Sequence, residues 1–258
     1  MRLLRQSTGV SLVLPPEAAL GAGGEARIYA VLPGEQYVAK IYHQAEQARA
    51  HKLSAMLANP PEDPLAVQGK LSIAWPLDLL HTLDTEPRFV GYLMPRVSGA
   101  QPLFHCYNPG SRRRFYPRFD SLALHRVARN LAAAVQALHS RGYVIGDVNE
   151  SNILVSEAAL ITLVDTDSFQ VVDARSGVTF RCPVGKPEYT PPELQGLSFA
   201  TTDRKPEHDR FGLAVLLFQL LMEGTHPFAG VYEGSDDPPP YEQRIRAAHY
   251  PHGSRKVP

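Results

Sequence analysis

Three polar side chains in the middle of the chain have the types and the spacing that phosphoryl transfer requires. Asp147 and Asn152 lie five residues apart after a long amphipathic pattern, and Asp165 ends an apolar strand pattern over 160–164. A carboxylate can accept the proton of an attacking hydroxyl, while an amide oxygen and a second carboxylate can hold metal ions on nucleotide phosphates. The spacing therefore predicts Asp147 as a base and Asn152 and Asp165 as metal ligands.

Composition sets the limits within which such a site must work. The 258 residues are 44% hydrophobic and 20% charged, which suits one or two well-packed lobes. The formal net charge is zero, which argues against broad binding to nucleic acid or anionic membranes. The longest apolar run, 211–222, is shorter than the roughly 20 residues of a spanning helix, and the N-terminus lacks the apolar region of a signal peptide. Two cysteines are too few for a disulfide framework, so we expect a reducing cytoplasm.

A glycine-rich stretch lies between two predicted strands, 10–14 and 27–32. Glycines let the backbone approach phosphate oxygens closely with free N–H groups, although a plain hairpin is the commoner use of such a turn. Nucleotide contacts are predicted at Gly21, Ala22, Gly23, Gly24 and Ala26.

The motifs together occur in one order, and in that order the chain resembles the eukaryotic-type (Hanks-type) protein kinase superfamily from residue 20 to 228. The motifs are the glycine stretch, Val38-Ala39-Lys40, Asp147 with Asn152, Asp165, Pro191-Pro192-Glu193 and Asp209. The resemblance implies an α+β, bilobal fold with an antiparallel-sheet N-lobe (1–94), a hinge (95–99) and a mainly helical C-lobe (100–258). That C-lobe is either shortened in this branch or truncated in this sequence, and bacterial members often carry a further helix-hairpin-helix region.

In the N-lobe, the resemblance implies a nucleotide site around Lys40, which would contact the α- and β-phosphates. Its partner would be Glu46, the only acidic residue of a predicted helix over 44–58. The alternative is that Glu46 merely lies favourably at a helix N-terminus. The remaining expected contacts are Ile28, Val38, the gatekeeper Met94, the carbonyl of Pro95 and the N–H of Val97.

The C-lobe begins with a segment, 100–120, that we predict to be an irregular, solvated insertion rather than a binding patch, despite its arginines. A helix over 121–139 follows, capped by Asp120 or Ser121 and stopped by Gly142. In the resemblance, this helix leads into the loop of Asp147, and Asp209 anchors that loop to the core. The alternative for Asp209 is a generic helix N-cap.

The loop departs from the family pattern at three places. Ile145-Gly146 replace His-Arg, so an activation-loop phosphate would lack its usual arginine partner. Asn149 replaces a catalytic lysine, and we predict that Lys186 supplies the missing cation instead of being an exposed loop lysine. Asp165 begins Asp-Thr-Asp rather than Asp-Phe-Gly, so no phenylalanine packing switch is expected.

Three functions remain open on the sequence. The first is a Ser/Thr protein kinase that uses ATP and Mg²⁺ (Mn²⁺ could replace it), with an unidentified protein substrate and, by family resemblance, a protein phosphatase partner. The second is a nucleotide-binding scaffold without activity, and the third is a small-molecule phosphotransferase. The Pro-Pro-Glu segment and Asp209 favour the protein kinase branch.

Overall fold

A computed structural model of the chain describes residues 1–33, 36–235 and 237–253. The chain divides into two compact units. The first contains residues 1–61, 73–98 and 171–180, and the second contains 62–72, 99–170 and 181–258. The boundary between residues 98 and 99 falls within the predicted hinge, 95–99. Each unit also contains a short segment from the other part of the chain: 62–72 belongs to the second unit and 171–180 to the first.

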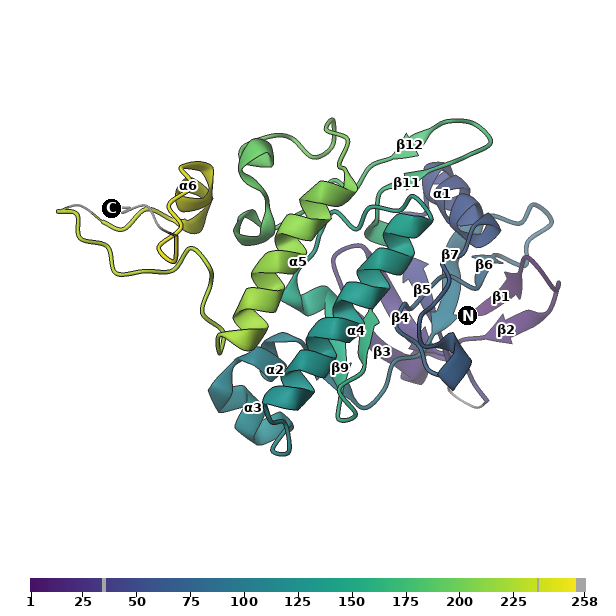
Figure 1. The fold of residues 1–258 in the computed structure, drawn as a ribbon. Helices are drawn as coiled ribbons and strands as arrows, with labels where there is room; N and C mark the ends of the chain where they lie inside the picture. Colours follow the sequence, from purple (N-terminus) through teal and green to yellow (C-terminus); the bar gives the residue numbers. More distant parts are fainter. Residues whose placement is uncertain (34–35, 236, 254–258) are drawn as a thin grey trace. The chain divides into compact units, whose positions relative to one another are not determined.

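The first unit is built on an antiparallel sheet, which within the described residues has seven strands in the order β2-β1-β6-β7-β5-β4-β3 (Figure 1). The strands are β1 (Arg2–Arg5), β2 (Ser11–Val13), β3 (Ala19–Ala22), β4 (Ala26–Ala30), β5 (Tyr37–Tyr42), β6 (Asp78–His81) and β7 (Phe89–Pro95). Strands β2 and β4 overlap the predicted strands 10–14 and 27–32, whereas β1 and β3 were not predicted.

One face of this sheet is covered by its own apolar core. The buried members are Leu3, Leu14, Tyr29, Val31, Ala39, Leu80 and Leu93. Helix α1 (Gln47–Ala58) buries Ala50, Leu53 and Met56, and the indole N–H of Trp75 donates to the Met56 carbonyl at 3.1 Å. A small ladder of β11 (Val171–Val172) and β12 (Thr179–Phe180) completes the unit.

A buried carboxylate ties β6 to the N-terminal hairpin of the first unit. Asp78 is 2% exposed, and its oxygens accept from Nε of Arg5 at 2.9 Å and from the backbone N–H of Ser7 at 3.0 Å. Burial by itself would raise the pKa of Asp78, but the hydrogen bonds from Ser7 and the contact with Arg5 outweigh it, so the pKa lies below its ordinary 3.8.

The lowered pKa predicts how stability depends on pH. Because the folded state holds Asp78 ionised, its contribution is present above pH 3.8 and is lost as the pH falls through the lowered folded-state value. We expect Asp78→Asn to reduce the urea-unfolding free energy at pH 7 and the difference from the wild type to shrink below pH 3.8. Asp84→Asn, at an exposed ion pair, should change neither. A pH-independent difference for Asp78→Asn would contradict the assignment.

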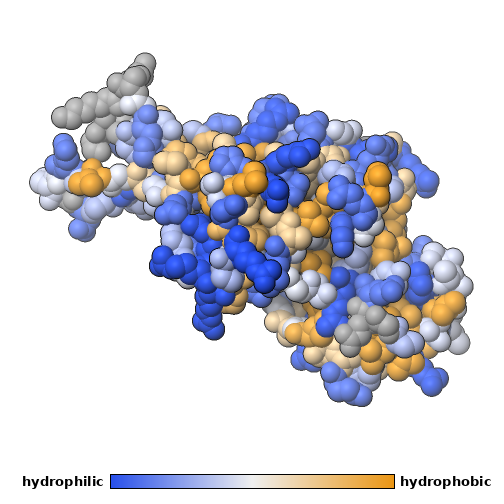
Figure 2. Space-filling view, turned by 60° about the horizontal axis from the view of Figure 1, so that its bottom comes forward, coloured by the Kyte–Doolittle hydropathy of each residue, from blue (hydrophilic) through white to orange (hydrophobic). Residues whose placement is uncertain are grey.

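The second unit is mainly helical (Figure 1). Its helices are α2 (Phe104–Tyr107), α3 (Pro109–Phe115), α4 (Ser121–Ser140), α5 (Pro206–Leu221) and α6 (Tyr241–Arg246), and a small sheet pairs β8 (Ala100–Pro102), β9 (Ile153–Ser156) and β10 (Ile161–Leu163). Helices α4 and α5 pack side by side. Among the residues described here, no helix combines the length and apolarity needed to cross a bilayer. Hydrophilic residues spread over the face shown in Figure 2, between smaller groups of apolar ones.

Helix α4 follows its predicted bounds closely. The Asp120 side chain accepts from the Ala123 N–H at 2.8 Å, which satisfies one free donor of the first turn. Its buried stripe contains Leu124, Val127, Leu131, Ala134, Val135 and Leu138. Arg141 is the C-cap, and Gly142 follows with φ +80°. The residues that follow, 143–145, are buried.

The prediction of a solvated insertion over 100–120 was wrong. The segment contains β8, α2 and α3, and Leu103 and Cys106 are fully buried. The hydroxyl of Tyr116 donates to the Val155 carbonyl at 2.7 Å, and Arg112 pairs with Glu223 at 2.8 Å. The segment is therefore packed into the second unit.

Candidate active site

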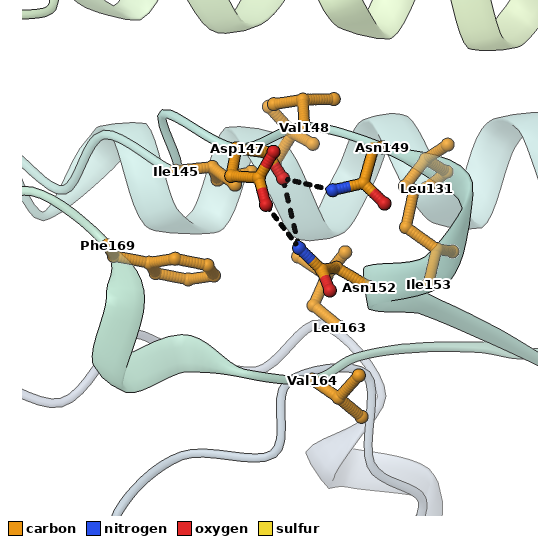
Figure 3. A pocket seen from close by; sticks show the side chains of 11 residues that line it. Leu131, Ile145, Asp147, Val148, Asn149, Asn152, Ile153, Leu163, Val164 and Phe169 are labelled. Atoms are coloured by element: carbon orange, nitrogen blue, oxygen red, sulfur yellow. Dashed lines mark hydrogen bonds between the residues drawn. The ribbon is translucent and has the colours of Figure 1, made fainter. Parts of the chain in front are cut away.

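The loop after α4 holds Asp147 through its own amide side chains. The Asn152 Nδ2 donates to the Asp147 carbonyl at 3.2 Å and to its carboxylate Oδ2 at 3.1 Å (Figure 3). The other carboxylate oxygen, Oδ1, is buried and has no hydrogen-bond partner among the described residues. A buried acceptor without a donor is costly, so a substrate hydroxyl that donates to it would be favoured. The structure thus brings these two predicted site residues together.

Asn149 braces the same loop. It is 2% exposed, its Nδ2 donates to the Asp147 carbonyl at 3.2 Å, and its Oδ1 accepts from the Ser151 N–H at 2.9 Å. Both ends of the amide are therefore used within the loop. Asn149 was predicted among the catalytic residues at the place of the family's lysine; in the structure it shapes the turn, and its part in catalysis stays a prediction.

Asn152 and Asp165 have the oxygen atoms that a hard cation prefers. Because Nδ2 of Asn152 is used by Asp147, its Oδ1 points away from that carboxylate (Figure 3). Asp165 has φ +57°, a backbone conformation that costs about 1 kcal/mol or more for a residue with a side chain and that often marks functional sites. Asp167 lies in the 3₁₀ turn Thr166–Ser168.

These two ligands fit Mg²⁺ only together with other oxygen donors. No group of three or more His, Cys, Asp or Glu side chains in the described residues could hold a metal ion. Mg²⁺ is commonly held by one or two protein side chains plus phosphate oxygens and waters. The donor set therefore fits a metal that arrives with a nucleotide.

An apolar pocket lies against Asp147. Its other lining residues are Leu131, Val135, Ile145, Val148, Asn149, Asn152, Ile153, Leu163, Val164 and Phe169 (Figure 3). Phe169 is 1% exposed and follows Asp165 by four residues. The sequence predicted no phenylalanine packing switch here because residue 166 is a threonine, and this stays a prediction. Phe169, which follows the turn Thr166–Ser168 and lines the pocket, was not singled out in the sequence.

Asp209 anchors the loop from α5. It is 1% exposed, and its carboxylate accepts from the N–H of Ile145 at 2.7 Å and of Gly146 at 2.8 Å. The ring Nε2 of His139, at the end of α4, lies 2.9 Å from the same carboxylate. Helix α5 has its N-cap at Lys205, so Asp209 is not the cap. The anchoring role implied by the resemblance is confirmed.

Lys186 lies beside the loop in an ion pair that the sequence did not reveal. Its Nζ is 2.9 Å from Glu150 Oε1 and 3.4 Å from Ser151 Oγ. Burial would raise the pKa of Glu150, but hydrogen bonds from Lys186 and Tyr189 lower it below its ordinary value. Glu150 therefore stays ionised and keeps the lysine next to the catalytic loop.

In the first unit, strand register collects the predicted nucleotide contacts on one face of the sheet. Ile28 pairs with Lys40, and Val38 pairs with both Ala30 and Met94, so these side chains point to the same side. Lys40 is 9% exposed, with its Nζ 5.9 Å from the Tyr42 ring centroid.

The glycine stretch divides between a strand and a turn. Gly21 and Ala22 belong to β3, and Gly23 donates to the Ala26 carbonyl at 2.9 Å to close the hairpin. The exposed Gly24 lies within that turn. At the other end of the sheet, Pro95 pairs with Tyr37, and Val97 follows β7 half-buried.

Glu46 does not take the place predicted for it. It is the N-cap of α1, outside the helix, and its side chain is exposed. The alternative position at a helix N-terminus describes it better. The buried face of α1 carries a lysine instead, Lys52, which is 9% exposed. One reason is that the helix begins three residues later than predicted, at Gln47.

Comparisons with known proteins agree on one family. A model described as the protein kinase domain matches residues 17–248. The chain is 38% identical over 250 residues to protein kinase YegI of Escherichia coli K12, covering 96% of this chain and 37% of that protein. It is 26% identical over 189 residues to mouse protein kinase C delta type, covering 70% and 25% respectively. The solved ROP18 kinase domain in complex with AMP-PNP and sucrose matches with a TM-score of 0.56 and 17% identity, over 88% of this chain and 68% of that one. The chain thus spans little more than a third of the YegI protein.

Proposed function

The chain belongs to the protein kinase family, as a bacterial Hanks-type kinase domain, and we propose that it transfers the γ-phosphoryl group of ATP to a serine or threonine hydroxyl of a protein. The observation that carries the proposal is the Asp147–Asn152 pair, with the carboxylate Oδ1 of Asp147 buried and without a hydrogen-bond partner among the described residues. That atom is a ready acceptor for the proton of an attacking hydroxyl.

The roles of the residues follow from their chemistry. Asp147 accepts the proton as the substrate oxygen forms its bond to the γ-phosphorus, while ADP leaves with the electrons of the broken P–O bond. Asn152 Oδ1 and the Asp165 carboxylate would hold Mg²⁺, and the ion would supply positive charge that neutralises the phosphate oxygens. Lys40, on the sheet face shared with Ile28 and Val38, contacts the α- and β-phosphates.

A labelling experiment tests the proposal. The protein is incubated with Mg²⁺ and γ-labelled ATP, alone and with a generic protein substrate, beside an Asp165→Asn variant. We expect label on protein that is lost in the variant. ATP-induced thermal stabilisation without transfer would support a nucleotide-binding scaffold instead, and label on a metabolite but on no protein would support a small-molecule phosphotransferase.

The setting of the reaction is part of the same proposal. Both cysteines are buried, and we propose that the domain works in a reducing cytoplasm. A protein phosphatase that reverses the modification is the partner proposed by family resemblance. Co-purification of phosphatase activity that removes the label from the modified protein would support it.

Lys186 is proposed as the cation that assists the transfer. Glu150 keeps its ammonium beside the loop, from where it can reach a phosphoryl oxygen as charge develops. We expect Lys186→Ala to lower kcat about 100-fold with little change in KM for ATP. Steady-state kinetics with a peptide substrate would measure both constants.

Two control variants sharpen this prediction. Lys186→Arg keeps a cation and should recover part of kcat, whereas Lys70→Ala, at an exposed lysine, should match the wild type. An unchanged kcat in Lys186→Ala would show that the lysine only pairs with Glu150.

A further inference from the structure

A buried arginine just before α5 connects the catalytic loop to the segment 182–185. Arg204 is 5% exposed. Its Nη1 donates to the Gly146 carbonyl and its Nη2 to the Val184 carbonyl. The guanidinium carbon lies 3.8 Å from the centroid of the Phe199 ring. One side chain thus binds both the residue before Asp147 and the segment that leads to Lys186.

The backbone of Arg204 is fixed by a second buried side chain. Gln170 Oε1 accepts from the Arg204 N–H at 2.8 Å, and Gln170 Nε2 donates to the Arg204 carbonyl at 2.8 Å. The backbone of Gln170 itself bonds to Val144, two residues before Gly146. The arginine therefore leaves a backbone that is already tied to the start of the catalytic loop.

Two glycines leave the space that the guanidinium occupies. A Cβ added at Gly146, where φ is +76°, would lie 2.9 Å from Arg204 Nη1 and 2.7 Å from the Cβ of Cys182. A Cβ added at Gly185 would lie 3.3 Å from both Nη atoms. Any larger residue at Gly146 would push the guanidinium out, so glycine there and arginine at 204 belong together.

The positive charge of Arg204 interacts with the carboxylates of Asp209 and Asp147. Burial lowers its pKa, while Cys182, Asp209 and Asp147 act in the opposite direction. An arginine stays protonated in proteins even so, because its ordinary pKa is far above neutral. The carbonyls of Gly146 and Val184 thus accept charge-assisted hydrogen bonds, which are stronger than neutral ones.

We propose that Arg204 is a positioning residue that holds Gly146 and the segment 182–185 in the arrangement needed for transfer, and that it does so without a phosphate on that segment. The inference rests on the proposed kinase function. The hydrogen bonds from Arg204 to the Gly146 and Val184 carbonyls order the segment in place of an added phosphate, so the domain is active as synthesised.

The experiment compares Arg204→Gln and Arg204→Lys with Arg181→Gln, a control at the nearby half-exposed ion pair with Asp203. We expect Arg204→Gln to lower kcat about 10- to 100-fold, to leave the Kd for ATP within twofold, and to speed amide exchange in 182–185. Arg204→Lys, which keeps the charge but only one of the two bonds, should lie between. Wild-type protein treated with a phosphatase, and shown by mass spectrometry to carry no phosphate, should keep its initial rate.

The outcomes separate the two proposals. Equal kcat in Arg204→Gln and the wild type, unchanged amide exchange in 182–185, or loss of activity after phosphatase treatment would each overturn the role of Arg204. Absence of any transfer by the wild type would overturn the kinase function, and amide exchange would still decide whether Arg204 orders the segment. Should Arg204→Gln fail to fold, Arg204→Lys carries the same comparison.

Discussion

Replacing Asp147 by Asn lowers kcat for phosphoryl transfer about 1,000-fold, within the range that general base catalysis contributes. The amide oxygen of the new side chain can still accept from Asn152 Nδ2, which now bonds to Asp147 Oδ2 at 3.1 Å. In the wild type, Asp147 Oδ1 is buried without a partner among the described residues. In the variant an NH₂ group takes the place of this oxygen, and it cannot accept a proton. The variant therefore removes the base and keeps the shape of the loop.

Three measurements isolate that effect. Steady-state kinetics with a peptide substrate give kcat, calorimetry gives the Kd for ATP, and urea unfolding gives stability. We expect only kcat to change. Asp237→Asn, at an exposed position in the second unit, is the matched control and should behave as the wild type. A kcat for Asp147→Asn within threefold of the wild type would mean that another group accepts the proton.

The parts of the site that sequence could predict are those encoded within a few residues. The apolar stripe of α4, its Asp120 cap and the Gly142 stop are local patterns, and so is the five-residue spacing of Asp147 and Asn152. Strand alternation likewise places Val38 and Lys40 on one face of β5. In each case the position of the side chain follows from residues close to it in the sequence.

The remaining parts depend on contacts between distant segments. Lys186 and Glu150 are 36 residues apart, and Arg204 and Gly146 are 58 apart. Nothing in the sequence near Arg204 distinguishes it from a surface arginine. Its guanidinium is buried because Gly146 and Gly185 leave space for it. Phe169 was missed because it comes three residues after Thr166, where the family pattern has its phenylalanine, and the turn Thr166–Ser168 lies between them. The role predicted for Glu46 was wrong for a local reason. The helix begins three residues later than predicted, which leaves Glu46 outside it.

The largest expected loss of stability follows from Asp209→Ala. The carboxylate is 1% exposed and satisfies two backbone N–H groups and the ring of His139. Removing it leaves the N–H groups of Ile145 and Gly146 without an acceptor and the His139 ring without its partner. Breaking a network of this kind costs about 3–5 kcal/mol. We expect the urea-unfolding free energy to fall by that amount, and the amide protons of Ile145 and Gly146 to exchange faster than those of α4.

Two further variants show that the loss comes from these hydrogen bonds. Asp209→Asn keeps one acceptor oxygen but turns an NH₂ group toward the other donors, so its loss should lie between the wild type and Asp209→Ala. Glu207→Ala removes an exposed carboxylate from the first turn of the same helix, where it pairs with Arg210 at 3.5 Å, and should cost less than about 0.5 kcal/mol. Equal stabilities for Asp209→Ala and Glu207→Ala would show that the catalytic loop is held by other contacts.

The Asp209→Asn variant should also affect catalysis, because Asp209 binds the N–H of Gly146, the residue before Asp147. We expect its kcat to fall by more than the fraction of unfolded protein at 25 °C would explain, since the loop is loosened while the domain stays folded.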